Sequence, residues 1–138
     1  MTNGVLWDSS AIVALLDAGD RRHQDAVDIA ERLAVEGRYG AITNYVEAET
    51  HALLLRRLGR GTALGWLLKP TIPAVRAVPA DEQRAREILT RYRDKDFSLC
   101  DAISFAVMQR LGVRTAFSFD RHFLQYGRFE VLGAGDDG

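Results

Sequence analysis

The chain has 138 residues, of which 47% are hydrophobic and 27% are charged, and 18 Lys and Arg against 19 Asp and Glu leave a formal net charge of −1. The apolar content excludes a disordered chain, the single cysteine excludes a disulfide framework, and no apolar run approaches the roughly 20 residues of a membrane span. The first residues lack the basic region and cleavage pattern of a signal peptide, so we expect one globular domain in the cytoplasm.

Strand-like and helix-like segments alternate along the sequence between residues 5 and 132. Short apolar runs are typical of buried strands, and the segments between them have helical periodicity or are apolar throughout. In chain order, the expected strands are 5–7, 39–43, 74–78, 115–119 and 129–132. The expected helices are 11–16, 22–35, one that opens at Asn44, 81–93, one that follows Ser98, and 121–124. This alternation predicts a single doubly wound α/β domain over residues 1–132, with a parallel sheet covered on both faces and residues 133–138 as a flexible tail.

Acidic residues stand where the expected strands end and the following helices begin. In an open parallel sheet, ligands bind outside the carboxyl ends of the strands, so polar residues at these points are candidates for a site. Four acids meet this condition, and we take them as the candidate site residues: Asp8, Glu49, Asp101 and Asp120. Ser118 lies two residues before the last acid, on the same face of its strand, and adds a hydroxyl group.

These acids also have purely structural interpretations. Asp8 could be the N-cap of the following helix, although Ser9 and Ser10 stand next to it and could cap that helix instead. Asp101 lies three residues after Ser98 and could close a capping box. The helix behind it is apolar on two faces, which would carry this carboxylate into the centre of the molecule, so we favour a functional role.

The helix that opens at Asn44 offers two glutamates. With Asn44 as the N-cap, Glu47 occupies the third helical position and completes a capping box, which is a sufficient structural role. Glu49 lies about 200° further round the helix, in line with Ala52 and Leu53, and is expected to point along the top of the sheet. We therefore expect Glu49 in the site and Glu47 in the cap.

A cluster of carboxylates at one edge of a sheet needs a compensating charge. Two like charges about 4 Å apart cost roughly 4 kcal/mol at an effective dielectric near 20, unless a pKa rises or a cation binds. The histidines share no metal-ligand spacing and the cysteine stands alone, so oxygen ligands for Mg²⁺ or Mn²⁺ are favoured over a zinc site. Such cations usually serve phosphate chemistry. If the four acids gather in one site, the rest of the chain carries 18 − 15 = +3, which is compatible with an RNA substrate.

The order and spacing of four segments resemble the PIN domain, and most closely the small VapC-like toxins of toxin–antitoxin pairs. The segments are 5–10, 43–50, 98–102 and 117–123. This resemblance covers nearly the whole chain, and it implies a three-layer α/β/α sandwich with a central parallel sheet and a Mg²⁺- or Mn²⁺-dependent endoribonuclease activity. One departure is Glu47, where such proteins more often have an apolar residue, so the resemblance leaves the second acid ambiguous between Glu47 and Glu49.

Catalytic and metal-binding roles are carried over by the resemblance onto Asp8, Glu49, Asp101 and Asp120, with Ser118 in support. It also implies an RNA substrate, such as tRNA or rRNA, a homodimer without membrane association, and a small antitoxin that inserts into the active-site groove. The alternative is a catalytically inactive PIN-like or receiver-like interaction module. A receiver would have adjacent acids after the first strand and a lysine after the last, whereas here Ser9 and Ser10 follow Asp8 and no lysine follows Phe119 or Leu132.

Other chemically notable residues have simpler interpretations. Cys100 is expected to be a small core residue, and His122 is expected at an exposed helix start rather than in contact with RNA. The basic residues of 84–95 suit a solvated helix face, while the few arginines that must hold RNA near the acids are not identified. The apolar stretch 64–68, with Trp66, fits a core position and a partner surface equally well.

Overall fold

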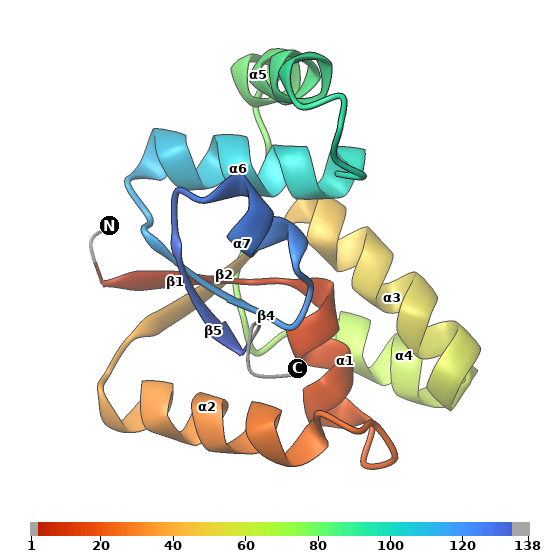
Figure 1. Ribbon diagram of the computed structural model, residues 1–138. Helices are drawn as coiled ribbons and strands as arrows, with labels where there is room; N and C mark the ends of the chain where they lie inside the picture. Colours follow the sequence, from red (N-terminus) through yellow and green to blue (C-terminus); the bar gives the residue numbers. More distant parts are fainter. Residues whose placement is uncertain (1–2, 134–138) are drawn as a thin grey trace.

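The computed structural model describes residues 3–133, and its centre is a five-stranded parallel sheet (Figure 1). The strands are β1 (Gly4–Trp7), β2 (Tyr39–Thr43), β3 (Ala74–Val75), β4 (Thr115–Ser118) and β5 (Glu130–Gly133), in the order β3-β2-β1-β4-β5. In the register of the central strands, Leu6 lies opposite Ala41 on β2 and Ala116 on β4. The expected doubly wound parallel sheet is confirmed.

Seven helices cover this sheet within the described residues. They are α1 (Ser9–Leu16), α2 (His23–Val35), α3 (Asn44–Leu58), α4 (Arg60–Leu68), α5 (Pro79–Arg91), α6 (Leu99–Leu111) and α7 (His122–Tyr126). In Figure 1, α5 and α6 stack above the sheet, α2 lies below it, and α3 and α4 lie together at one side. No helix of residues 3–133 has the length and apolarity needed to cross a lipid bilayer.

Alternation along the central strands divides the core between the two faces of the sheet. Leu6 and Ala116 point toward α5, α6 and α7, where they join a cluster that includes Phe105. Val5 and Phe117 point the other way, into the cluster formed with α1 and α2. Both faces are therefore sealed by helices, and the ends of the strands are the places left for polar residues.

Two boundaries differ from those expected. β3 ends at Val75 rather than at residue 78, because the chain leaves the sheet to begin α5 at Pro79, a residue suited to the first helical position. β5 extends through Gly133, which we had assigned to the tail, while the rest of that expected tail, 134–138, lies outside the described residues. Trp66 of α4 is half-buried against two small apolar clusters, so it contributes to the core, and its role as a partner surface stays a prediction.

The strand order places a topological switch point between β1 and β4. From β1 the chain builds the sheet outward through β2 and β3, then returns to the other side of β1 for β4 and β5. A crevice forms where consecutive connections leave in opposite directions, outside the carboxyl ends of the two central strands. Asp8 follows β1 directly and Ser118 ends β4, so both lie at this crevice.

Candidate functional site

Asp8 is the buried centre of the candidate site, with only 3% of its surface exposed. Its Oδ2 accepts hydrogen bonds from the hydroxyls of Ser10 (2.7 Å) and Ser118 (3.0 Å), and from the Ser10 N–H at 3.3 Å. Asp8 is the N-cap of α1, so the expectation that a serine would cap this helix is wrong. The reason is that Asp8 has an extended backbone, whereas Ser9 and Ser10 are already helical.

This environment disfavours a negative charge on Asp8. Its pKa is raised from 3.8 to about 6, mainly by burial and in smaller part by the charges of Asp101, Asp120 and Glu49, against the lowering effect of the Ser10 hydrogen bond. The structure therefore brings the other three predicted acids within electrostatic range of Asp8. A bound cation would reverse this penalty.

Ser118 ties the ends of the two central strands together. Its side chain is fully buried, and its hydroxyl donates to Asp8 and accepts the Asp120 N–H at 3.0 Å. Because Oδ2 of Asp8 is engaged by serine hydroxyls, Oδ1 is the oxygen without a hydrogen bond among the described residues. The hydroxyl that we expected beside the last acid thus orients the first.

The start of α3 differs by one residue from the expected capping pattern. Thr43 is the N-cap, with its Oγ1 accepting the Val46 N–H at 3.0 Å, while Asn44 instead accepts the Ala77 N–H at 2.8 Å. Glu47 is consequently not at the third helical position, and the capping-box role predicted for it is wrong. The shift arises because the Asn44 side chain is used to hold the segment that follows β3.

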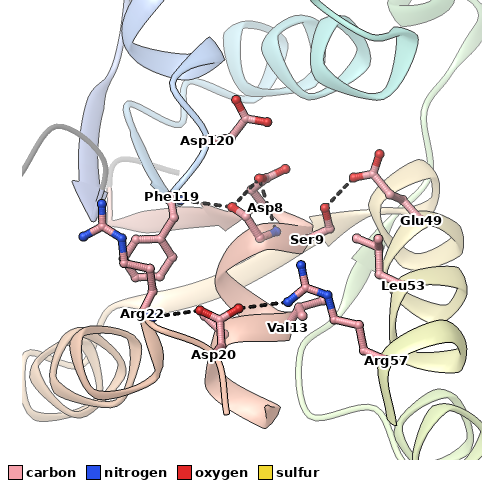
Figure 2. Close-up of a pocket in the computed structure, with 12 residues that line it drawn as sticks. Asp8, Ser9, Val13, Asp20, Arg22, Glu49, Leu53, Arg57, Phe119 and Asp120 are labelled. Atoms are coloured by element: carbon pink, nitrogen blue, oxygen red, sulfur yellow. Dashed lines mark hydrogen bonds and ion pairs between the residues drawn. The ribbon is translucent and has the colours of Figure 1, made fainter. Parts of the chain in front are cut away.

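Glu49 points into the site from the second turn of α3. Its carboxylate accepts a hydrogen bond from the Ser9 hydroxyl, and it lines a pocket together with Asp8 and Asp120 (Figure 2). Glu47 is not among the residues that line this pocket. The geometry therefore favours the choice of Glu49 that the helix-face argument made.

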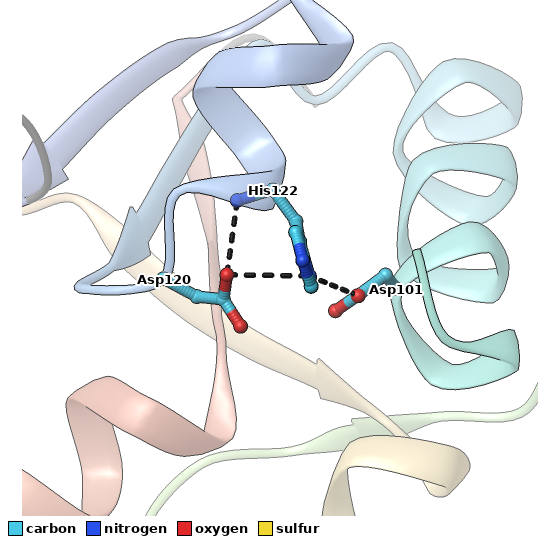
Figure 3. Close-up of side chains that lie close together, drawn as sticks. All are labelled: Asp101, Asp120 and His122. Atoms are coloured by element: carbon cyan, nitrogen blue, oxygen red, sulfur yellow. Dashed lines mark hydrogen bonds and ion pairs between the residues drawn. The ribbon is translucent and has the colours of Figure 1, made fainter. Parts of the chain in front are cut away.

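Asp101, Asp120 and His122 form a group of possible metal ligands, because one ligand atom from each lies within 4.8 Å of the others. The Nδ1 atom of His122 lies 2.6 Å from Oδ2 of Asp101 and 3.2 Å from Oδ1 of Asp120, so the imidazole sits between the two carboxylates (Figure 3). Asp120 also accepts the His122 N–H at 2.9 Å, which turns the chain back at the start of α7. Asp120 belongs to this group and to the pocket, and it joins the two.

Asp101 serves the helix and the site at once. Ser98 and Asp101 form the expected capping box at the start of α6, with Asp101 accepting the Ser98 N–H at 2.9 Å. Burial raises the pKa of Asp101, and the charge of Asp120 adds to this, while the hydrogen bonds from Ser98 and His122 act in the other direction. The capping box is confirmed, and the functional role of Asp101 stays a prediction.

His122 is the residue that the sequence interpretation missed. Its side chain is 24% exposed and engaged with two carboxylates, rather than lying at an open helix start. The available signal was its position two residues after Asp120, where a turn brings the imidazole back onto the acid. Its contact with Asp101, 21 residues away, has no such local signal.

The donor set fits a hard divalent cation. It consists of carboxylate oxygens and one imidazole, which suit Mg²⁺ or Mn²⁺. Cys100 is half-buried beside Ile12, Ile42 and Val46, and burial, followed by the charge of Glu49, raises the pKa of its thiol. It therefore remains a neutral packing residue, as expected, and offers no thiolate ligand.

Comparison with known proteins identifies the family. The model of the PIN domain matches residues 5–128. The 23S rRNA-specific endonuclease VapC20 of Mycobacterium tuberculosis is 38% identical over 131 residues, which cover 92% of this chain and 97% of that protein. Ribonuclease VapC26 of the same species is 28% identical over 137 residues, which cover 93% of this chain and 99% of that protein. The crystal structure of VapC20 superimposes with a TM-score of 0.82 at 32% identity, covering 92% of this chain and 98% of that one.

A DNA-bound VapBC complex from Salmonella typhimurium shares the fold alone, with a TM-score of 0.69 and 12% identity over 95% of this chain and 97% of the other. The expected PIN-like α/β architecture is thereby confirmed. Taken with the match over most of its length, these similarities show that the chain belongs to the PIN-domain family, among the VapC-like ribonuclease toxins.

Proposed function

We propose that this chain is a metal-dependent endoribonuclease and the toxin of a toxin–antitoxin pair, with Asp8, Glu49, Asp101 and Asp120 as its acidic site residues. The observation that carries this proposal is the convergence of these carboxylates at the β1/β4 switch point, where burial, together with the charges of the other three acids, raises the pKa of Asp8. Such an arrangement is costly to the empty protein and is explained by a cation that it holds.

Each acid has a distinct part in the proposed site. Asp8 and Asp101 hold the metal most directly, Glu49 is a further ligand or an anchor for its waters, and Asp120 completes the pocket. Ser118 keeps Asp8 oriented through Oδ2, leaving Oδ1 for the cation. His122 holds the carboxylates of Asp101 and Asp120 toward each other.

When bound, Mg²⁺ or Mn²⁺ supplies charge neutralisation at the phosphodiester and lowers the pKa of the attacking water. The carboxylates of Asp8 and Asp101 would hold such an ion beside the buried end of β1. The carboxylate oxygens of the site suit Mg²⁺ and Mn²⁺ alike, so we propose that either ion supports cleavage.

The names of similar proteins support a proposed substrate and partner. VapC20 is named as a 23S rRNA-specific endonuclease, so ribosomal RNA is the first substrate to test, with tRNA as the second. Solved relatives include toxin–antitoxin complexes, and we propose a cognate antitoxin and a homodimeric toxin for this chain. Because these RNAs reside in the cytoplasm, we propose that the protein acts there.

The test is cleavage of purified ribosomes and of total tRNA, read by sequencing the RNA ends. We expect cleavage with Mg²⁺ or Mn²⁺, none in EDTA, and at least a hundredfold loss for Asp8→Asn and Asp101→Asn, as for removal of a group central to transition-state stabilisation. Glu47→Gln is the matched control and should retain activity, because Glu47 does not line the pocket. Full activity in Asp8→Asn would refute the site, and labelling by acetyl phosphate without RNA cleavage would favour a receiver-like module.

A further inference from the structure

One face of α3 runs the length of the active-site pocket. Glu49, Leu53 and Arg57 are spaced by four residues, so they share this face, and all three line the pocket (Figure 2). At 1.5 Å per residue, Arg57 lies about 12 Å along the helix from Glu49. The helix therefore presents an acidic end, an apolar middle and a basic end to the same groove.

Arg57 reaches from α3 across the lower part of the pocket (Figure 2). Its Nη1 lies 2.9 Å from Asp20 and 3.9 Å from Asp17, both in the connection between α1 and α2. Nη2 and Nε have no hydrogen-bond partner among residues 3–133, and 49% of the side chain is exposed. An ion pair this exposed is worth at most about 1 kcal/mol, so the guanidinium can exchange it for another anion.

A site built from four carboxylates repels RNA unless cations offset them. Among the described residues that line the pocket, the cationic ones are Arg22 and Arg57. Arg22 is only 14% exposed at its side chain and lies over the Phe119 ring, 5.5 Å from the ring centroid. The accessible cation in the pocket is therefore Arg57.

We propose that Arg57 binds a phosphodiester of the RNA substrate. This phosphodiester neighbours, on the same strand, the one that is held at the acids, so Arg57 sets where the strand lies in the groove. This inference rests on the proposed ribonuclease function and adds a substrate-binding residue to it. A guanidinium presents parallel N–H donors that match two phosphate oxygens, which a lysine ammonium cannot reproduce. Asp20 holds the guanidinium in the pocket until RNA arrives.

The experiment measures binding of a fluorescein-labelled single-stranded RNA of mixed sequence by anisotropy, in Ca²⁺, with the RNA verified as intact on a gel. Arg57→Ala should weaken RNA binding about tenfold at low salt. It should also make the slope of the logarithm of the association constant against log[salt] shallower by about 0.7, the value for one phosphate contact on a single strand. Arg56→Ala is the matched control, because Arg56 has the same charge on the same helix but does not line the pocket. Equal affinities and slopes for the two variants would overturn the proposal.

Two further variants separate phosphate binding from a structural role. Arg57→Lys should recover the salt slope but only part of the affinity. Asp20→Ala removes a carboxylate and keeps the cation, so RNA affinity should hold or rise; a loss as large as that of Arg57→Ala would show that the ion pair is only structural and overturn the proposal. In cleavage of ribosomal RNA, Arg57→Ala should raise KM with little change in kcat. Failure of the wild type to bind or cleave RNA would instead refute the proposed function.

Discussion

The substitution Asp8→Asn is expected to stabilise the metal-free protein while it abolishes cleavage. Asn is as good an N-cap as Asp and nearly the same size, so the start of α1 is preserved. The carboxylate, in contrast, is buried, and this burial, with a smaller contribution from three nearby acids, raises its pKa from 3.8 to about 6. At about 1.4 kcal/mol for each pKa unit, ionised Asp8 costs the folded state about 3 kcal/mol at neutral pH.

The increase in the free energy of unfolding that Asp8→Asn produces must depend on pH in a defined direction. Because the pKa of Asp8 is higher in the folded than in the unfolded chain, its penalty is fully present above about 6 and disappears as the pH falls through 3.8. Urea unfolding in EDTA at pH 7.5 should therefore show Asp8→Asn more stable than the wild type by about 1 to 3 kcal/mol, since the amide satisfies the serine hydroxyls less well. At pH 4 the difference should be small.

Metal should reverse the order of stability. A divalent ion that binds only the folded wild type stabilises it in proportion to RT ln(1 + [L]/Kd), and Asp8→Asn should lack most of this gain. Asp94→Asn, at an exposed acid, is the control and should change stability by less than about 0.5 kcal/mol under all conditions. If Asp8→Asn is less stable than the wild type in EDTA at pH 7.5, or its effect is independent of pH, the electrostatic reasoning fails.

Three other predictions follow from separate contacts. Arg110→Ala should destabilise the fold by about 2 to 3 kcal/mol in urea, because the buried Asp81 loses a bidentate partner at 2.9 Å. Burial alone would raise the pKa of Asp81, but the hydrogen bond from Arg110 holds this pKa below its usual range. The stabilisation by Arg110 should therefore be present at neutral pH and vanish as the pH falls below about 4. A loss of stability that is independent of pH would contradict this prediction. Gly40→Ala should cost about 1 to 3 kcal/mol in thermal unfolding, because the new methyl group would lie 2.8 Å from Nε1 of Trp7; an unchanged Tm would show that the indole moves freely. His122→Ala should weaken Mn²⁺ binding by about tenfold or more in calorimetry, as the two carboxylates lose their shared partner, and unaltered affinity would remove His122 from the site.

Much of the fold was predictable because its signals are local. The five strands are short apolar runs, and the acids that follow them are fixed to the carboxyl edge once the sheet is parallel. The same logic placed Asp8 and Asp120 near one another before any contact was known, whereas Asp101 follows α5 with no strand between them and was pointed to only by its place at the start of a helix that is apolar on two faces. Glu49 was separable from Glu47 because the two residues lie on different faces of one helix.

What escaped prediction depends on contacts between distant segments or on one-residue shifts. The N-cap of α3 is Thr43 because Asn44 is occupied by Ala77, a partner 33 residues away. His122 meets Asp101 only after α7 folds against α6, and Arg57 meets Asp20 through the packing of α3 beside α1. No periodicity encodes such pairings, so they require the three-dimensional structure.

The double use of Asp101 has an evolutionary consequence. Asp101 closes a capping box, so it still stabilises the fold after catalysis is lost. Ionised Asp8, in contrast, destabilises the folded state whenever no cation is bound. Relaxed selection should therefore erase Asp8 first and leave Asp101 behind. Among descendants of this chain, a preserved acid at the start of α6 would be poor evidence of an active enzyme, and the residue at the end of β1 would be the informative one.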